Sequence, residues 1–268
     1  MGVLGFLAIG MTFVMISGGI DLSSYTAVSA AAVVGATIMV ATESALLGSS
    51  VMLLVGLFFG TINGIAIAYL KMIPFIVTLS TMVLAQGFAI WFTKAQSVYG
   101  LPDSLIDLIT DRLFGYMPMP AILIFIVAII SGFILRYTKM GRELYLTGSN
   151  EHTAEISNIN IKSSKFSVYL VSGLMAGITA IVLSGIVETS TTSMVRDERL
   201  MDVIAATVIG GASLKGGSGS IIGTLFGLLF LTMLGNAFNL LGVSPFIAMV
   251  IKGFVLVAVI GLDVLRTK

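Results

Sequence analysis

The sequence predicts an all-α protein, a polytopic bundle of transmembrane helices, and three observations lead to this fold class. Of the 268 residues, 57% are hydrophobic and only 10% are charged, and the mean hydropathy is +1.09. A soluble domain carries roughly 25% charged residues, so too few charges remain to cover a surface that faces water. The apolar residues fall in runs of about 20, the length that crosses a bilayer as a helix. No segment reads as a strand or as a soluble domain, so residues 1–268 are predicted to form a single transmembrane domain.

Taken in chain order, the apolar runs predict about nine membrane crossings. They cover residues 1–17, 22–41, 45–70, 74–92, 119–137, 166–187, 200–209, 221–236 and 245–262. The run 200–209 is long enough only for a half-helix. Two sets of glycines recur at every fourth position, Gly56, Gly60 and Gly64 in one helix and Gly219, Gly223 and Gly227 in another. Small residues at that spacing let two helix backbones approach closely, so these glycines predict helix packing.

Residues 138–165 form a long polar segment between two apolar runs, and they set the expected orientation. The segment carries Lys139, Arg142, Lys162 and Lys165, and the positive-inside rule places such a loop in the cytoplasm. Alternating crossings then put the C-terminus in the cytoplasm and the N-terminus outside. Other basic residues on the cytoplasmic side are Lys71, Lys215, Arg266 and Lys268. The charged residues on the outer side are of both signs: Glu43, Lys94, Asp103, Asp107, Asp111, Arg112, Glu188, Arg196, Asp197, Glu198 and Arg199. Because the first run is short for a crossing, we expect one further helix upstream of Met1.

A short helix is predicted within this polar segment. Ser149 or Asn150 is suited to cap a helix that ends near Ser157, and Glu151 lies in its first turn, where a negative charge favours the helix dipole. Asn158 is suited to end it, because asparagine tolerates the left-handed conformation. A short helix on a basic cytoplasmic loop is a natural contact for a soluble partner, and a solvated connector is the alternative. The residues assigned to this contact are Asn150, Glu151, His152, Thr153, Ala154, Glu155 and Ile156.

Polar residues inside the apolar runs are the candidates for a solute path, since ionisable groups at membrane depth are costly and usually functional. Lys252, in the last run, is the clearest case. Amide side chains in such helices either bind a polar solute by hydrogen bonds or join two helices. The full set of candidates is Asn63, Phe75, Gln86, Asn236, Asn239 and Lys252. Asp21 lies in a glycine-flanked break, where capping of the following helix is favoured over contact with a solute.

Several classes of function are excluded by the sequence. Without cysteine the chain has no thiolate nucleophile and no cysteine-ligated metal. The only histidine, His152, is expected to face water and has no partners at ligand spacing, so no metal site and no catalytic residue is assigned. The glycine-rich run 210–217 matches neither phosphate-binding pattern and is expected to form a tight turn, so the chain itself is not expected to hydrolyse ATP. The formal net charge of +1 excludes a nucleic-acid binder driven by bulk charge.

Four motifs carry a family resemblance that covers nearly the whole chain. The first is Gly10-Met11-Thr12 leading to Gly18-Gly19-Ile20-Asp21-Leu22-Ser23, and the second is Pro74-Phe75-Ile76-Val77-Thr78-Leu79 with Met82. The third is Gly141-Arg142 followed by Gly148, Asn150-Glu151 and Ser157-Asn158-Ile159-Asn160. The fourth runs from Asp202-Val203-Ile204-Ala205-Ala206 through Ile209-Gly210-Gly211 to Gly216-Gly217, Gly219 and Gly223-Thr224. By these motifs the chain resembles the permease of a ribose-type, or monosaccharide, ABC importer.

The resemblance implies a multi-pass protein of the cell membrane with about ten spans, one more than predicted here, which fits a missing first helix. It also implies a dimer with a second permease chain, identical or different, surrounded by membrane lipid. An ATP-binding cassette subunit, which holds ATP and Mg²⁺, would bind the cytoplasmic loops. Residues 150–156 would be the coupling helix. An extracytoplasmic binding protein would deliver the solute. The permease chain itself would hold no cofactor and would bind no nucleic acid.

Two departures from the family pattern, Ser24-Tyr25-Thr26 after Ser23 and Leu200 in place of a glutamate, leave the solute open. A branched-chain amino-acid ABC permease is the nearest alternative. An ion-coupled secondary carrier is a more distant alternative, because the apolar runs hold almost no carboxylates for a coupling ion. A membrane scaffold without transport would have packing glycines but no polar residues within the membrane.

Overall fold

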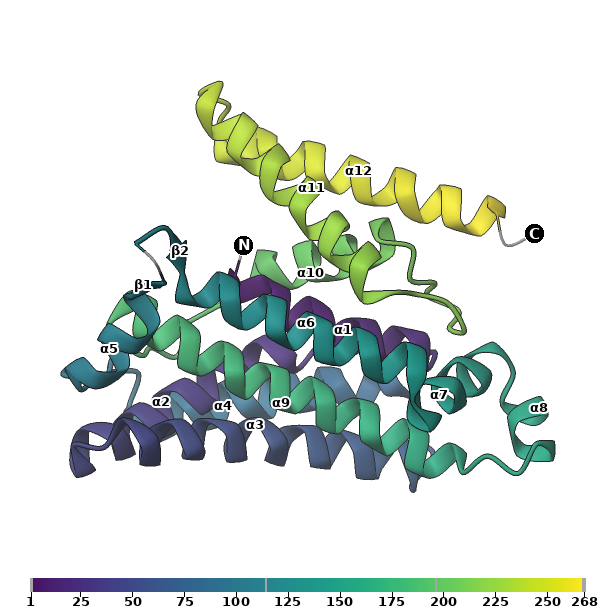
Figure 1. Cartoon of the computed structure of the whole chain (residues 1–268), viewed down its shortest axis with the longest axis horizontal. Helices are drawn as coiled ribbons and strands as arrows, with labels where there is room; N and C mark the ends of the chain where they lie inside the picture. The colour runs from purple at the N-terminus through teal and green to yellow at the C-terminus, as the bar shows by residue number, and fades with distance from the viewer. Residues whose placement is uncertain (1, 114, 196, 267–268) are drawn as a thin grey trace.

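The fold is a bundle of long helices that lie side by side, as the computed structural model in Figure 1 shows; the structure describes residues 2–113, 115–195 and 197–266. The long helices are α1 Gly2–Ile16, α2 Ser24–Thr42, α3 Ala45–Ala68, α4 Pro74–Thr93, α6 Met119–Tyr137, α9 Ile161–Val187, α11 Ile221–Leu240 and α12 Pro245–Arg266. The shorter helices are α5 Asp103–Thr110, α7 Lys139–Ser149, α8 Glu151–Ile156 and α10 Asp197–Ile209. The predicted all-α class is thereby confirmed.

Most predicted helices begin and end within a few residues of their apolar runs, and the larger differences have local causes. Helix α9 begins earlier than predicted because the side chain of Asn160 caps it by accepting the N–H of Ser163. The expectation that the chain has no strand is wrong, since Arg112–Leu113 (β1) pairs antiparallel with Met117–Pro118 (β2). Helices α5 and α7 are also additions to the predicted set. Residues Arg196 and Lys268, which entered the charge count of the predicted topology, lie outside the described residues.

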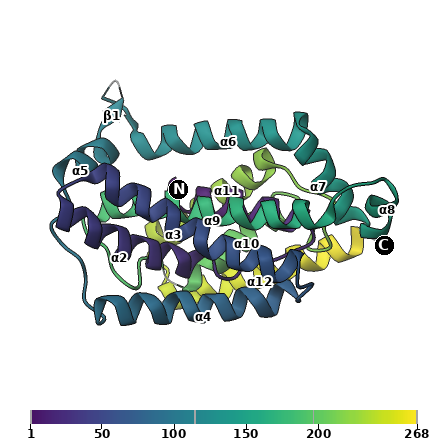
Figure 2. The same ribbon diagram turned by 90° about the horizontal axis from the view of Figure 1, so that it is seen from below.

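The connecting segments gather at two opposite ends of the bundle. Helix α5 and the hairpin β1–β2 lie at one end, which we call the α5 end, and α7 and α8 lie at the other, which we call the α8 end (Figures 1 and 2). At the α5 end, Val98 pairs with Ser190 through backbone hydrogen bonds. At the α8 end, the ring of Tyr69, after α3, meets that of Phe166, near the start of α9. Lys71, which the charge pattern assigns to the same side as residues 138–165, follows Tyr69 by two residues and so lies at the α8 end as well.

Helices α3 and α9 pack closely along much of their length, and they run antiparallel. A Cβ on Gly56 would overlap the carbonyl oxygen of Gly173, and one on Gly60 would overlap that of Tyr169. Gly64 packs mainly against the ring of Phe166, which a Cβ would approach to 2.7 Å. Only glycine leaves room for such a contact, so the packing role predicted for these three glycines is confirmed.

The second set of predicted packing glycines joins α10 to α11. A Cβ on Gly223 would overlap the carbonyl oxygen of Gly210, and one on Gly227 would overlap that of Ala206. The third member, Gly219, was predicted to lie in the helix and does not. It precedes α11 with φ +153°, and Ser220 begins the helix by accepting the N–H of Gly223. Helices α10 and α11 therefore form a tight helical hairpin across a glycine-rich turn.

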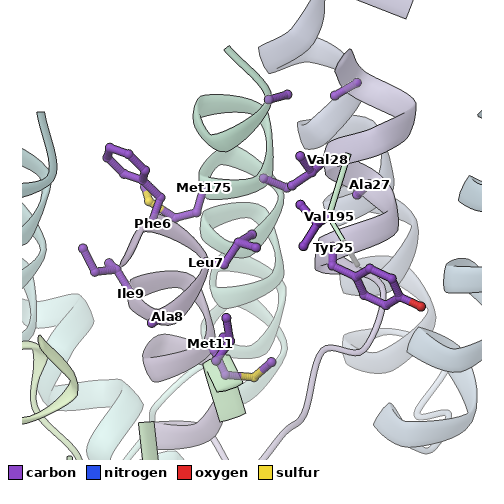
Figure 3. Close-up of a cluster of buried hydrophobic side chains, with 14 of the residues drawn as sticks. Phe6, Leu7, Ala8, Ile9, Met11, Tyr25, Ala27, Val28, Met175 and Val195 are labelled. Carbon is purple, nitrogen blue, oxygen red and sulfur yellow. The ribbon is translucent and has the colours of Figure 1, made fainter. Parts of the chain in front are cut away.

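Helix α1 lies in the interior of the bundle. Phe6, Leu7, Ile9 and Met11 are all buried, and Figure 3 shows several of them facing the side chains of α2 and Met175 of α9. A helix that is apolar on every side belongs inside a bundle rather than at its surface. The hydroxyl of Thr12 shares a 2.7 Å hydrogen bond with that of Thr224, which ties α1 to α11.

Within the described residues, six helices are long and apolar enough to cross a membrane, by length and composition: α2, α3, α4, α6, α9 and α11. Two shorter apolar stretches accompany them, Val3–Ile16 and Pro245–Val255. Helices α4 and α6 lie on opposite sides of the bundle in Figure 2 and expose large apolar side chains such as Trp91 and Ile129. Such faces are costly in water and favourable against lipid, so the structure is that of a multi-pass membrane protein.

Candidate functional site

A cavity of about 770 Å³ lies between four helices in the half of the bundle nearer the α5 end. Its walls come mainly from the first turn of α1, from α10, from residues 228–239 of α11 and from α12. Much of the wall is apolar, and Leu228, Leu231 and Met249 are examples. A few polar groups interrupt it, namely Arg199, Asp202, Thr232, Asn236, Asn239 and Lys252. An apolar cavity with a small number of polar groups is typical of a binding site for a small molecule.

The charged groups of the cavity form a network that joins α10 to α12. The ammonium of Lys252 lies 3.0 Å from both carboxylate oxygens of Asp202, and the guanidinium of Arg199 lies 3.8 Å from one of them. The side chains of Asp202 and Lys252 are 14% and 28% exposed, so both are largely withdrawn from solvent. Burial of either charge without the other would be costly, and the pair therefore stabilises the contact between the two helices.

The structure brings together three of the six residues that the sequence suggested for a solute path. Asn236, Asn239 and Lys252 line the cavity. The other three lie elsewhere: Asn63 donates to the hydroxyl of Ser23, Gln86 donates to the carbonyl of Thr192, and Phe75 is exposed at the start of α4. By these hydrogen bonds Asn63 links α3 to the segment before α2, and Gln86 links α4 to the segment before α10.

A buried polar cluster surrounds Asp21 in the break between α1 and α2. Its carboxylate accepts the backbone N–H of Ser23 at 2.9 Å and the hydroxyl of Ser172, on α9, at 2.6 Å. Since Ser23 immediately precedes α2, Asp21 satisfies a free backbone donor at the helix start, as predicted. Asn63 extends the cluster to α3 through Ser23, so the break is fixed by hydrogen bonds to two neighbouring helices.

Helix α8 stands out from the α8 end with most of its surface free. The side chain of Asn150 caps it by accepting the N–H of Thr153, and Asn158 follows it in the left-handed conformation with φ 58°, as predicted. Ala154 is buried and anchors the helix, whereas Ile156 is 74% exposed. The remaining residues of the predicted contact, Glu151, His152, Thr153 and Glu155, are exposed too. An exposed isoleucine among polar groups is suited to contact another protein.

Sequence comparison places these features in a known family. Residues 1–260 match the family described as branched-chain amino acid transport system / permease component. The chain belongs to this family. The match spans α1 to α12, so the cavity and α8 both lie within it.

Members of the family with a stated solute are similar over nearly the whole chain. The ribose import permease protein RbsC of Haemophilus influenzae is 37% identical over 268 residues, which cover 98% of this chain and 82% of the relative. RbsC of Bacillus subtilis is 36% identical and covers 97% of this chain and 80% of the relative. The L-arabinose transport system permease protein AraH of Escherichia coli is 35% identical, with 98% and 80% covered. No solved structure was found to match the chain.

Proposed function

We propose that the chain is the permease subunit of an ABC importer for a monosaccharide or a similar neutral polyol. One observation carries the proposal: a cavity with polar groups and an exposed docking helix lie at opposite ends of one membrane bundle. A transporter driven by a separate ATPase needs both features. The ribose and arabinose permeases among its relatives support a sugar as the solute.

The proposed topology has nine crossings, with α7, α8 and the C-terminus in the cytoplasm. Six long apolar helices, together with α1, α12 and the half-helix α10, add up to this number. The basic side chains of Lys71, Arg142 and Lys215 all lie in segments at the α8 end, which supports a cytoplasmic location for that end. The cavity then lies in the outer half of the bundle, where an extracytoplasmic binding protein would deliver the solute.

The proposed mechanism is alternating access. ATP and Mg²⁺ bind to the partner ATPase, whose closure displaces the α8 helices of a permease dimer. The displacement tilts the spanning helices and opens the cavity to the outside, and hydrolysis resets the complex. Such a cycle requires a rigid lever joined to a bundle with two stable arrangements. The buried Ala154 and the ion pair between Glu151 and Lys165 hold α8 to the bundle and make it suitable as the lever.

The cavity wall suits a solute with many hydroxyl groups. Asp202 accepts hydrogen bonds, Lys252 and Arg199 donate them, and the amides of Asn236 and Asn239 do both. A branched-chain amino acid is the second candidate, because the same wall presents both signs of charge to a zwitterion and the family description names such amino acids.

Uptake measurements decide between these candidates. We expect cells that express the chain with its ATPase and binding protein to accumulate radiolabelled D-ribose, L-arabinose or D-allose. Excess unlabelled sugar should lower uptake at least about tenfold, whereas excess leucine should not, since a site built for one solute rejects another by several kcal/mol. As a control for an ion-coupled carrier, sugar uptake is measured after the proton gradient is collapsed at normal ATP.

Two outcomes would contradict the proposal. Leucine uptake that no sugar competes with would assign the chain to amino-acid import. Sugar uptake that stops when the proton gradient collapses at normal ATP would indicate an ion-coupled carrier.

A further inference from the structure

Three segments meet at the α8 end in a contact made almost entirely of backbone. They are the end of α1 with the following glycines (residues 16–18), the second half of α7 (residues 145–148) and the glycine turn between α10 and α11 (residues 216–219). We call this contact the glycine junction. It joins the segment that carries α8 to the helical hairpin that carries two walls of the cavity.

Gly148 occupies the centre of the junction. A Cβ at this position would overlap the carbonyl oxygen of Ile16 and would lie 2.6 Å from the nitrogen of Gly217. The N–H of Gly217 donates to that same carbonyl of Ile16 at 2.9 Å. Gly216, with φ +90°, is equally close, because a Cβ there would lie 2.7 Å from the carbonyl oxygen of Gly148. With backbone against backbone, no flexible side chain is present to absorb a displacement of α7.

Tyr145 supplies a side-chain bond across the junction. Its hydroxyl donates to the carbonyl oxygen of Gly219 at 2.7 Å, from α7 to the turn before α11. Burial raises the pKa of Tyr145, so the hydroxyl remains a donor at neutral pH. Gly219 immediately precedes Ser220, the residue that caps α11. A displacement of Tyr145 is therefore applied two residues before the first residue of α11.

The hairpin beyond the junction is held together by backbone contacts and reaches the cavity. Helices α10 and α11 are in backbone contact at Gly210 and Gly223 and again at Ala206 and Gly227. Asp202 lies one turn further along α10, and Asn236 and Asn239 lie at the far end of α11. A rigid hairpin of this kind turns a small displacement at its turn into a displacement of the cavity wall.

We propose that Tyr145 and Gly148 are positioning residues that transmit the movement of α8 to the cavity, through the turn at Gly216–Gly219. The proposal rests on the proposed function, because it names the route between the ATPase contact and the solute. A junction that served stability alone would not need to join this loop segment to the helices that line the cavity. This route predicts that a substitution in the glycine junction uncouples ATP hydrolysis from transport. Binding of the ATPase and binding of the solute should both remain intact.

The test uses Tyr145→Phe in the complete importer, reconstituted in proteoliposomes with its ATPase and binding protein. The substitution keeps the ring and removes one hydrogen bond. Sugar uptake per ATP hydrolysed is expected to fall about threefold to tenfold, the range that one lost hydrogen bond accounts for. The KM for the sugar and the retention of the ATPase are expected to stay at wild-type values, and the melting temperature is expected to fall by about 4 °C at most, the cost of one hydrogen bond. Tyr69→Phe is the matched control, since Tyr69 lies at the same end with its ring against Phe166.

Gly148→Ala provides a stronger variant, with the loss of coupling expected to exceed that of Tyr145→Phe. Its melting temperature shows whether it folds, and Tyr145→Phe keeps the test valid if it does not. Wild-type uptake per ATP in Tyr145→Phe would overturn the proposal, and so would a ratio that falls equally in the control Tyr69→Phe. Failure of the wild-type complex to take up any sugar would instead refute the proposed function, so the two failures are distinguishable.

Discussion

Gly173→Val is expected to lower the melting temperature by about 10 °C, whereas Gly132→Val is expected to leave it nearly unchanged. A Cβ on Gly173 would overlap the carbonyl oxygen of Gly56 and would lie 3.0 Å from the Cα of Gly60. These are backbone atoms of the neighbouring helix α3, so the two helices must separate. Overpacking of this kind costs typically 1–3 kcal/mol, and roughly 2–4 °C are lost per kcal/mol in a protein of this size.

Gly132 is the matched control because it lies in the spanning helix α6 with no atom within 4 Å of an added Cβ. The two substitutions change helix propensity equally, so the difference between them reports packing alone. The measurement is the monodisperse fraction that survives heating of the detergent-purified protein. Equal melting temperatures for the two variants would show that α3 and α9 are not in backbone contact.

Asp202→Asn is expected to destabilise the protein by about 2 kcal/mol and to weaken the contact of α12 with α10. It leaves the ammonium of Lys252 in the cavity without its carboxylate partner. Loss of one partner of a buried pair costs roughly 3–5 kcal/mol, and an exposed pair is worth at most about 1 kcal/mol. The expected value lies between, because the cavity admits water to a pair that is 14% and 28% exposed.

The double variant Asp202→Asn with Lys252→Met should recover most of the loss, since neither charge is then left alone. Lys139→Met is the matched control, because Lys139 pairs with Glu143 at the surface and its side chain is 83% exposed. A double-mutant cycle in the melting temperature measures the coupling. If the falls in melting temperature of the two single variants simply add in the double variant, the ion pair does not stabilise the contact between α12 and α10.

The helices of the bundle could be predicted from the sequence because lipid demands long apolar runs. The cap of α8 was also predictable, since it depends on the local positions of Asn150 and Asn158. Helix α5 was missed because it is a short amphipathic helix: Leu105 and Ile109 are buried, and the acidic residues Asp103 and Asp107 resemble those of a polar loop. Its role depends on contact with α9, which no local pattern records.

The cavity could be predicted only in part. Lys252 stood out as a charge within an apolar run, but its partner Asp202 lies 50 residues away and on another helix. The sequence also could not separate Asn236 from Asn63, since both are amides in apolar helices. The fold separates them: Asn63 lies against Ser23, and Asn236 lines the cavity.

Cysteine labelling in intact cells tests the central claim most directly, namely that α8 faces the cytoplasm and the cavity faces outward. The chain has no cysteine, so His152→Cys and Tyr116→Cys each introduce one exposed thiol, on α8 and in the β1–β2 hairpin. A membrane-impermeant maleimide should label Tyr116→Cys in intact cells and His152→Cys only after the membrane is permeabilised. Labelling of His152→Cys in intact cells would place the docking helix on the wrong side for an ATPase and would contradict the proposed mechanism.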